Sequence, residues 1–208
     1  MELFQPSPCP LVAILRGLTP AEAPEVGRIL FESGFRILEV PLNRPQAIEA
    51  MRELLRIAPD DALVGAGTVL TIEDVEAVRA AGGRLIVSPH CAVEVISHAV
   101  KSGMIAMPGV TTPTEAYSAL GAGAQGLKLF PAEMIPPAAV KSIRSILPPG
   151  TPLFPVGGIT PQQMAPYVAA GATGFGIGGQ LYRPQVEAGA LKRAAAAFMS
   201  ARKLILQG

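Results

Sequence analysis

One pattern recurs along the whole chain and limits the folds open to it: an apolar run, a turn, and then a stretch with the apolar spacing of a helix. Near-continuous apolar strands that alternate with helices are typical of a parallel sheet covered by helices. Eight such units predict closure into a (β/α)8 barrel, the TIM-barrel form of the α/β class, as a single domain over residues 1–208. The expected strands are residues 11–15, 36–40, 62–65, 84–87, 104–107, 126–130, 153–156 and 173–177.

The same pattern also fits an open doubly wound sheet. The barrel is favoured because the units number eight and because no dinucleotide-binding glycine fingerprint follows the first apolar run. A chain of 208 residues is short for a barrel, for which about 250 is typical, so its loops must be short. Helices are expected to begin where a hydroxyl can cap the first turn, at Thr19-Pro20, Thr71, Thr112-Pro113 and Thr160-Pro161.

Composition narrows the class of protein. Half of the residues are hydrophobic, which supplies a sizeable core, and the net charge of +1 gives no reason to expect nucleic acid or an anionic membrane as a partner. The two cysteines, Cys9 and Cys91, lack CxxC spacing, so reduced thiols in a cytoplasmic protein are expected. Residues 1–6 lack the basic and apolar segments of a secretory signal.

Lys128 is the most unusual residue, because it places a cation inside the apolar run Gly126–Pro131. Alternate side chains of a strand share a face, so Lys128 should lie on the side of Phe130. Burial disfavours the ammonium form, and a neutral amine attacks carbonyl carbons. One hypothesis is therefore a lysine that forms a Schiff base. The alternative, equally open from this residue alone, is a structural lysine that is ion-paired or extends past the strand end.

Three further polar residues are expected at the carboxyl ends of strands, where barrel enzymes carry their active sites. Arg16 ends the first apolar run, Glu39 stands late in the second, and Thr68 follows the third. If the faces that carry Arg16 and Glu39 point inward, both converge with Lys128 at the barrel mouth. The alternative is a structural network of ion pairs among the same side chains.

Glycines form a second group at the same predicted edge. The seventh run leads through Gly157 and Gly158 to the helix start at Thr160, and Gly178 and Gly179 follow the eighth run. Backbone N–H groups at a helix N-terminus bind anions, and glycine lets a ligand approach the backbone closely. The loops after strands seven and eight are the usual phosphate site of barrel enzymes, so their location favours phosphate binding over simple turn chemistry.

Metal chemistry is not expected. The two histidines, His90 and His98, stand eight residues apart with no convergent pair of carboxylates. His90 follows the fourth run and could line the mouth, whereas His98 falls within a helical pattern. No Ser-His-Asp or Cys-His arrangement can be argued from the sequence.

In its motifs the chain resembles the class I 2-keto-3-deoxy-6-phospho-aldonate aldolases, the KDPG and KDPGal aldolases, over essentially its whole length. In this order and spacing the matching segments are highly specific, and they are Glu39–Asn43, Gly65–Val69, Ser88-Pro89, Lys128–Ala132 and Gly157–Pro161. The resemblance implies a barrel that assembles as a homotrimer and needs no metal or cofactor. It also implies a small phosphorylated keto-deoxy sugar acid as the substrate.

The resemblance assigns roles to individual residues. Lys128 would form the Schiff base and Glu39 would transfer protons. The substrate carboxylate and pyruvyl portion would lie against Arg16, Thr68, Pro89 and Phe130, and the phosphate against Gly157, Gly158, Gly178 and Gly179.

Specificity within the family is expected to depend on a few positions. Val156 stands where gluconate-type members tend to carry threonine, and Asn43 where they often carry arginine, although Arg44 is adjacent. The ending Leu181–Arg183 is also similar to the galactonate type. Gln180 departs from the serine or aspartate that relatives often place there. These positions favour a galactonate-type substrate, with the gluconate epimer as the near alternative.

Two other classes of protein remain open. A phosphosugar isomerase or synthase on the same barrel would not need a covalent Lys128. A non-catalytic phosphosugar-binding barrel is the third reading, and the convergence of Lys128 with Glu39 argues against it.

Overall fold

The computed structural model describes residues 9–207, so the segment 1–6, where no secretory signal was expected, lies outside the described residues. All eight predicted strands are present, each within two residues of its expected bounds. A further short strand, β6, follows β5 after Pro108, a residue with no N–H to donate to a ladder. The strands are β1 (Leu11–Ile14), β2 (Ile37–Pro41), β3 (Leu63–Gly67), β4 (Leu85–Val87), β5 (Ile105–Met107), β6 (Gly109–Val110), β7 (Leu127–Leu129), β8 (Leu153–Pro155) and β9 (Phe175–Ile177).

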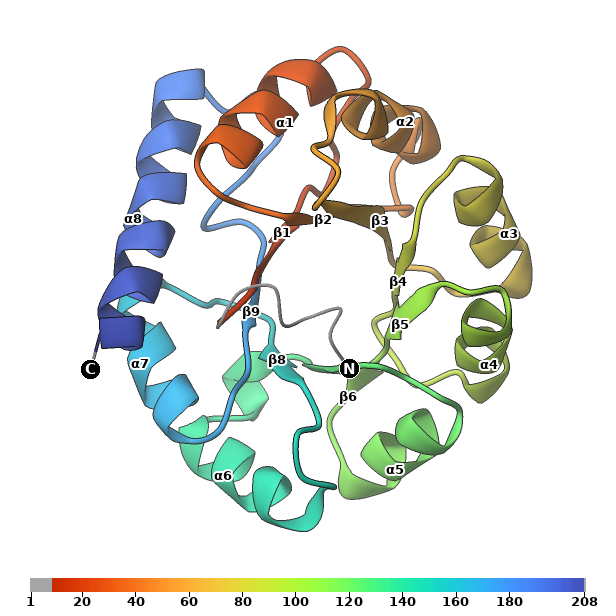
Figure 1. Ribbon diagram of the computed structural model, residues 1–208, viewed down its shortest axis with the longest axis vertical. Helices are drawn as coiled ribbons and strands as arrows, with labels where there is room; N and C mark the ends of the chain where they lie inside the picture. The colour runs from red at the N-terminus through yellow and green to blue at the C-terminus, as the bar shows by residue number, and fades with distance from the viewer. Residues whose placement is uncertain (1–8, 208) are drawn as a thin grey trace.

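Helices follow the strands and lie outside them (Figure 1). They are α1 (Ala23–Glu32), α2 (Ala47–Ile57), α3 (Ile72–Ala80), α4 (Val93–Lys101), α5 (Pro113–Gly121), the 3-10 helix η2 (Ala132–Met134), α6 (Pro137–Ile146), α7 (Pro161–Ala169) and α8 (Ala188–Gln207). Within residues 9–207, no helix combines the length with the apolar character that a bilayer-spanning segment needs.

The predicted helix starts hold at three of four places. Thr71 caps α3 and Thr112 caps α5, each in a capping box, and α7 begins at Pro161 directly after Thr160. The start predicted at Thr19-Pro20 is wrong, because α1 begins at Ala23. The Thr19 hydroxyl accepts from the Glu22 N–H (3.3 Å) and donates to the Glu22 carboxylate (2.7 Å), so it caps a separate turn ahead of the helix.

The strands are parallel and curve around a common axis, which confirms the α/β class. They form two hydrogen-bonded sheets rather than one continuous sheet. The larger has the order β5-β4-β3-β2-β1-β9 and the smaller the order β6-β7-β8. An isolated parallel bridge between Val156 and Gly176 connects the end of β8 to β9.

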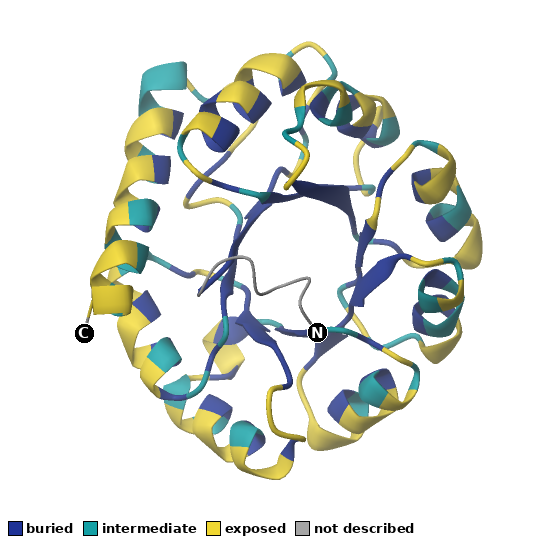
Figure 2. Ribbon diagram, in the orientation of Figure 1, coloured by how far each residue is buried: buried dark blue, intermediate teal, exposed yellow. Residues whose placement is uncertain are grey.

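The strands are buried, and their side chains contribute to two hydrophobic clusters (Figure 2). One cluster packs between the strands and the surrounding helices. A smaller cluster lies inside the ring of strands, where Val12, Ile37 and Leu63 stand in register on β1, β2 and β3. Because side chains alternate along a strand, Glu39 shares the inner face of β2 with Ile37. This confirms the predicted inward face of the second strand.

Candidate active site

Lys128 lies at the centre of β7, in register with Gly109 of β6 and Phe154 of β8. Its side chain is buried, with 6% of the residue exposed, and its Nζ lies 4.8 Å from the centroid of the Phe130 ring. Burial lowers the pKa of Lys128, Glu39 opposes this effect, and the Arg16 guanidinium adds to it. The amine is therefore more often neutral than an ordinary lysine, which increases its nucleophilicity.

Glu39 lies on the inner face of β2 with 1% of the residue exposed. Burial raises the pKa of its carboxyl from 4.5 to about 7, against the lowering effects of Lys128 and Arg16. Within residues 9–207 its Oε2 atom has no hydrogen-bond partner. A carboxyl that ionises near neutral pH, coupled to a lysine and an arginine, can both accept and return a proton.

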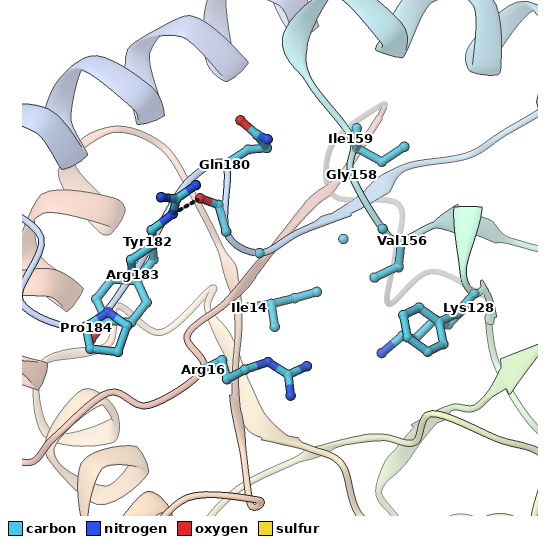
Figure 3. Close-up of a pocket in the computed structure, with 15 residues that line it drawn as sticks. Ile14, Arg16, Lys128, Val156, Gly158, Ile159, Gln180, Tyr182, Arg183 and Pro184 are labelled. Carbon is cyan, nitrogen blue, oxygen red and sulfur yellow. Dashed lines mark hydrogen bonds between the residues drawn. The ribbon is translucent and has the colours of Figure 1, made fainter. Parts of the chain in front are cut away.

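A cavity of about 290 Å³ lies beside these residues (Figure 3). In this view Lys128 and Val156 form one side, Arg183 and Gln180 the other, and Arg16 projects between them. Eight of the predicted site residues line the cavity, and they come from β7 and from the segments that directly follow β1, β7, β8 and β9. They are Arg16, Lys128, Phe130, Val156, Gly157, Gly158, Gly178 and Gly179. The tertiary structure thus brings eight of the twelve predicted residues to one cavity.

Four predicted residues do not line this cavity. Glu39 is buried behind it, close enough to shift the pKa of Lys128. Thr68 is half-buried directly after β3, and Pro89 is half-buried after β4. Asn43 is exposed in the loop after β2, so its predicted role in specificity has no contact here to support it.

Thr68 has a backbone feature that its sequence does not reveal. Its φ angle is +54°, in the left-handed region that β-branched residues rarely adopt. Strain of this kind concentrates at functional sites, where the rest of the structure imposes it. The conformation is consistent with a role for Thr68 in positioning substrate.

The loop after β8 contains two glycines with positive φ angles. Gly157 and Gly158 have φ angles of +125° and +61°, which glycine adopts without steric cost. The Glu133 carboxylate packs against this turn, since an ideal Cβ on Gly157 would lie 2.3 Å from its Oε2. Within residues 9–207, the N–H groups of Gly158 and Gly179 donate to no protein acceptor. The Gly179 N–H is therefore available to an anion, whereas an anion at Gly158 would share the turn with the Glu133 carboxylate.

The loop after β9 contributes residues that the sequence did not assign. Tyr182, Arg183 and Pro184 line the cavity together with Gln180. The Arg183 Nε donates to the carbonyl oxygen of Gly179 (3.1 Å). The available signal was its position, four residues after the second glycine pair, but charge alone does not distinguish it from a surface arginine.

The histidines lie apart from the cavity. His90 is exposed, and His98 makes a 2.7 Å contact with Glu76 between α4 and α3. In the described part of the chain, no group of three His, Cys, Asp or Glu side chains is arranged to hold a metal ion.

Comparisons with known proteins show the family of this chain. The family model for KDPG and KHG aldolases matches residues 7–196. The probable 2-dehydro-3-deoxy-6-phosphogalactonate aldolase of Rhizobium meliloti is 44% identical over 96% of this chain and 94% of its own. The 2-dehydro-3-deoxy-6-phosphogalactonate aldolase of Escherichia coli is 43% identical over 95% of this chain and 97% of its own.

Solved structures agree with these relatives. A native KDPGal structure superposes with a TM-score of 0.94 at 42% identity, covering 97% of this chain and 98% of the other. A KDPG aldolase from Legionella pneumophila, with pyruvate captured as a covalent carbinolamine, superposes with a TM-score of 0.78 at 27% identity, covering 98% and 96%. This chain therefore belongs to the KDPG and KHG aldolase family.

Proposed function

We propose that this protein is a class I aldolase that cleaves 2-dehydro-3-deoxy-6-phospho-D-galactonate to pyruvate and D-glyceraldehyde 3-phosphate. The observation that carries the proposal is the buried Lys128, with its lowered pKa, opening into a cavity beside Arg16 and Glu39. Relatives named for this activity match the chain over nearly its full length.

The proposed reaction begins when neutral Lys128 Nζ attacks the C2 ketone to give a carbinolamine, which loses water to form an imine. The protonated imine accepts the electron pair of the C3–C4 bond as that bond breaks. The C4 hydroxyl loses its proton, and C4 leaves as the aldehyde carbon of glyceraldehyde 3-phosphate. The enamine that remains is protonated at C3, and hydrolysis releases pyruvate and restores Lys128.

Glu39 is proposed to carry the protons, through a water molecule. Its pKa of about 7 suits both directions of transfer, because an efficient general acid or base titrates near the working pH. The unpartnered Oε2 is an acceptor that such a water can use.

Binding roles follow from position. Arg16, with Thr68, holds the substrate carboxylate by charge-assisted hydrogen bonds, and Phe130 with Pro89 encloses the pyruvyl portion. The phosphate binds at the two glycine turns that line the cavity, Gly157-Gly158 and Gly178-Gly179, where within residues 9–207 the Gly158 and Gly179 N–H groups have no protein acceptor.

The gluconate epimer is the second candidate substrate. Val156 favours the galactonate epimer, because this buried residue lines the cavity where gluconate-type members tend to carry threonine. The two substrates differ at C4, so a hydroxyl at position 156 changes what the site can bond there. Cleavage of both epimers by the wild type and by Val156→Thr tests the assignment, and a wild-type preference for the gluconate epimer would overturn it.

We also propose that residues 1–208 form one domain with a complete barrel, and that the protein assembles as a homotrimer. We propose that it acts in the cytoplasm, in galactonate catabolism. For the barrel, the Lys128 N–H donates to the Pro108 carbonyl (2.9 Å) and so links β7 to the end of β5. For the trimer, Leu70, Ile72 and Val93 expose apolar side chains where α3 and α4 begin. Light scattering across protein concentrations tests the trimer.

Borohydride trapping with pyruvate is the decisive experiment. Reduction should fix pyruvate to the protein, and peptide mass analysis should place the adduct on Lys128, with or without a metal chelator. Lys128→Met should abolish both trapping and cleavage, whereas Lys141→Met, at an exposed lysine of α6, should leave both unchanged. Cleavage that persists in Lys128→Met would overturn the Schiff-base proposal.

A further inference from the structure

The charges that line the cavity are unbalanced. Its lining includes three cations, Arg16, Lys128 and Arg183, and no carboxylate. The proposed substrate brings a carboxylate at one end and, near pH 7, a phosphate of charge about −1.5 to −2 at the other. Lys128 is committed to the ketone and Arg16 lies beside it. The phosphate end therefore has one cation available among the lining residues, Arg183.

Arg183 is placed for this task. Its Nε donates to the Gly179 carbonyl (3.1 Å), so the guanidinium lies against the glycine turn whose N–H groups are free. In Figure 3 it stands on the side of the cavity opposite Lys128. Within residues 9–207 no carboxylate forms an ion pair with it. A guanidinium has five N–H donors, so about four remain for bidentate binding of a phosphate.

The loop that carries Arg183 is held in place. The N–H groups of Leu181 and Tyr182 both donate to the Gly178 carbonyl (2.8 and 3.0 Å), and both side chains are buried. The Gln185 N–H donates to the Glu22 carboxylate (2.7 Å), which fastens the loop to the turn before α1. A fixed backbone reduces the conformational entropy that Arg183 loses when it binds a ligand.

The same loop packs against the loop that carries Arg16. An ideal Cβ on Gly17 would lie 2.9 Å from Pro184 Cγ, so the segments following Arg16 and Arg183 are in contact. This packing places the backbone segments that carry the two arginines side by side. Both cations therefore line one cavity from adjoining loops.

We propose that Arg183 binds the phosphate of the substrate and sets the preference for phosphorylated over unphosphorylated keto-deoxy sugar acids. This assignment rests on the proposed aldolase function and names the residue that supplies charge to the phosphate end. The neighbouring lining residue Gln180 is neutral, so it supplies no charge to the phosphate.

Arg183→Ala and Arg183→Lys test the assignment. Loss of charge-assisted hydrogen bonds should lower kcat/KM for the phosphorylated substrate roughly 10- to 100-fold in Arg183→Ala, and inorganic phosphate should inhibit less strongly. Arg183→Lys should recover part of the loss, because an ammonium keeps the charge but not the bidentate geometry. Arg193→Ala, at an exposed arginine of α8, is the matched control and should match the wild type.

Exchange of pyruvate methyl protons in D2O provides a readout free of phosphate. It uses the same Lys128 imine, so it should be unchanged in Arg183→Ala. An equal loss of exchange and cleavage, or an unchanged response to phosphate, would overturn the assignment. If Arg183→Ala does not fold, Arg183→Gln retains a donor for the Gly179 carbonyl and gives the same comparison.

The outcome also separates this proposal from the proposed function. Wild-type protein that pyruvate and borohydride fail to label at Lys128 would overturn the aldolase function itself. Normal labelling, together with unchanged selectivity for phosphate in Arg183→Ala, would overturn the role of Arg183 alone.

Discussion

The Glu39 carboxyl occupies the space beside Gly67 that a side chain at position 67 would need. An ideal Cβ on Gly67 would lie 1.7 Å from Glu39 Oε2, well inside any permitted contact. Glu39 is on β2 and Gly67 ends the neighbouring strand β3, where it is in register with Pro41. The glycine thus makes room for a buried acid, so the two positions should respond to mutation as a pair.

Gly67→Ala should destabilise the protein by about 1–3 kcal/mol, because the added methyl group collides with the Glu39 carboxyl. Glu39→Ala removes the obstacle, so the double variant should be more stable than the sum of the two single changes predicts. Urea denaturation of all four proteins gives the coupling free energy. Gly121→Ala, where a Cβ meets nothing within 4 Å, is the control. Additive effects of the Gly67 and Glu39 changes would contradict the packing relationship.

Glu39→Gln should remove a proton-transfer step. We expect kcat to fall about 10²- to 10⁴-fold, and the inflection of kcat/KM near pH 7 to disappear, because this carboxyl titrates at about 7 in the native protein. Glu49→Gln, at an exposed position of α2, should preserve the wild-type profile. A variant that keeps the inflection would assign it to a different group.

The same carboxyl should make stability depend on pH. Its pKa is raised from 4.5 to about 7, so between those values the native protein holds a proton that the unfolded chain has released. The free energy of unfolding therefore falls as pH rises through this interval. Glu39→Gln removes this titration, so its stability relative to wild type should increase between about pH 5 and pH 8 by on the order of 2 kcal/mol. Thermal unfolding at both pH values measures the difference, and a relative stability independent of pH would contradict it.

Thr68→Gly should stabilise the fold and weaken substrate binding. The φ angle of +54° costs a β-branched residue roughly 1 kcal/mol or more, and glycine is free of this cost. Loss of the hydroxyl should raise KM for the substrate. Denaturation midpoints and steady-state kinetics on one preparation test both parts. A less stable variant would show that Thr68 makes contacts that outweigh its strain.

The two glycine turns should respond differently to alanine. Gly157→Ala combines an unfavourable φ of +125° with a contact of 3.1 Å to the backbone N of Ala132, so it should destabilise the protein by more than about 1 kcal/mol. At Gly179 a Cβ meets nothing within 4 Å, so Gly179→Ala should leave stability within about 0.5 kcal/mol of wild type. The Gly179 methyl should still raise KM for a phosphorylated substrate, because Gly179 lines the cavity at the proposed phosphate site. Comparing melting temperatures with KM values separates the two effects.

Much of the site could be predicted because strand periodicity is local. The alternation of side chains along the chain correctly placed Glu39 on the inner face of β2 and Arg16 at the cavity, and the glycine pairs marked the loops after β8 and β9. The start of α1 was misplaced because the Thr19 hydroxyl caps a separate turn that precedes the helix, and the Thr-Pro signature does not distinguish such a turn from a helix start. The closed sheet was expected in one piece, but Pro108 interrupts the strand between β5 and β6.

By itself, the sequence determined which residues stand at the carboxyl ends of the strands, because strand positions follow from local apolar runs. It also determined which face of a strand each side chain is on, because side chains alternate with a period of two residues. It also carried the motifs of the aldolase family. Only the tertiary structure decided how far Lys128 and Glu39 are buried from solvent, since the strands that bury them are far apart in the chain. This burial is the largest cause of their shifted pKa values. Only the tertiary structure, too, brought Arg183 to the cavity and left Asn43 in solvent, because loop packing against distant residues sets where such side chains lie.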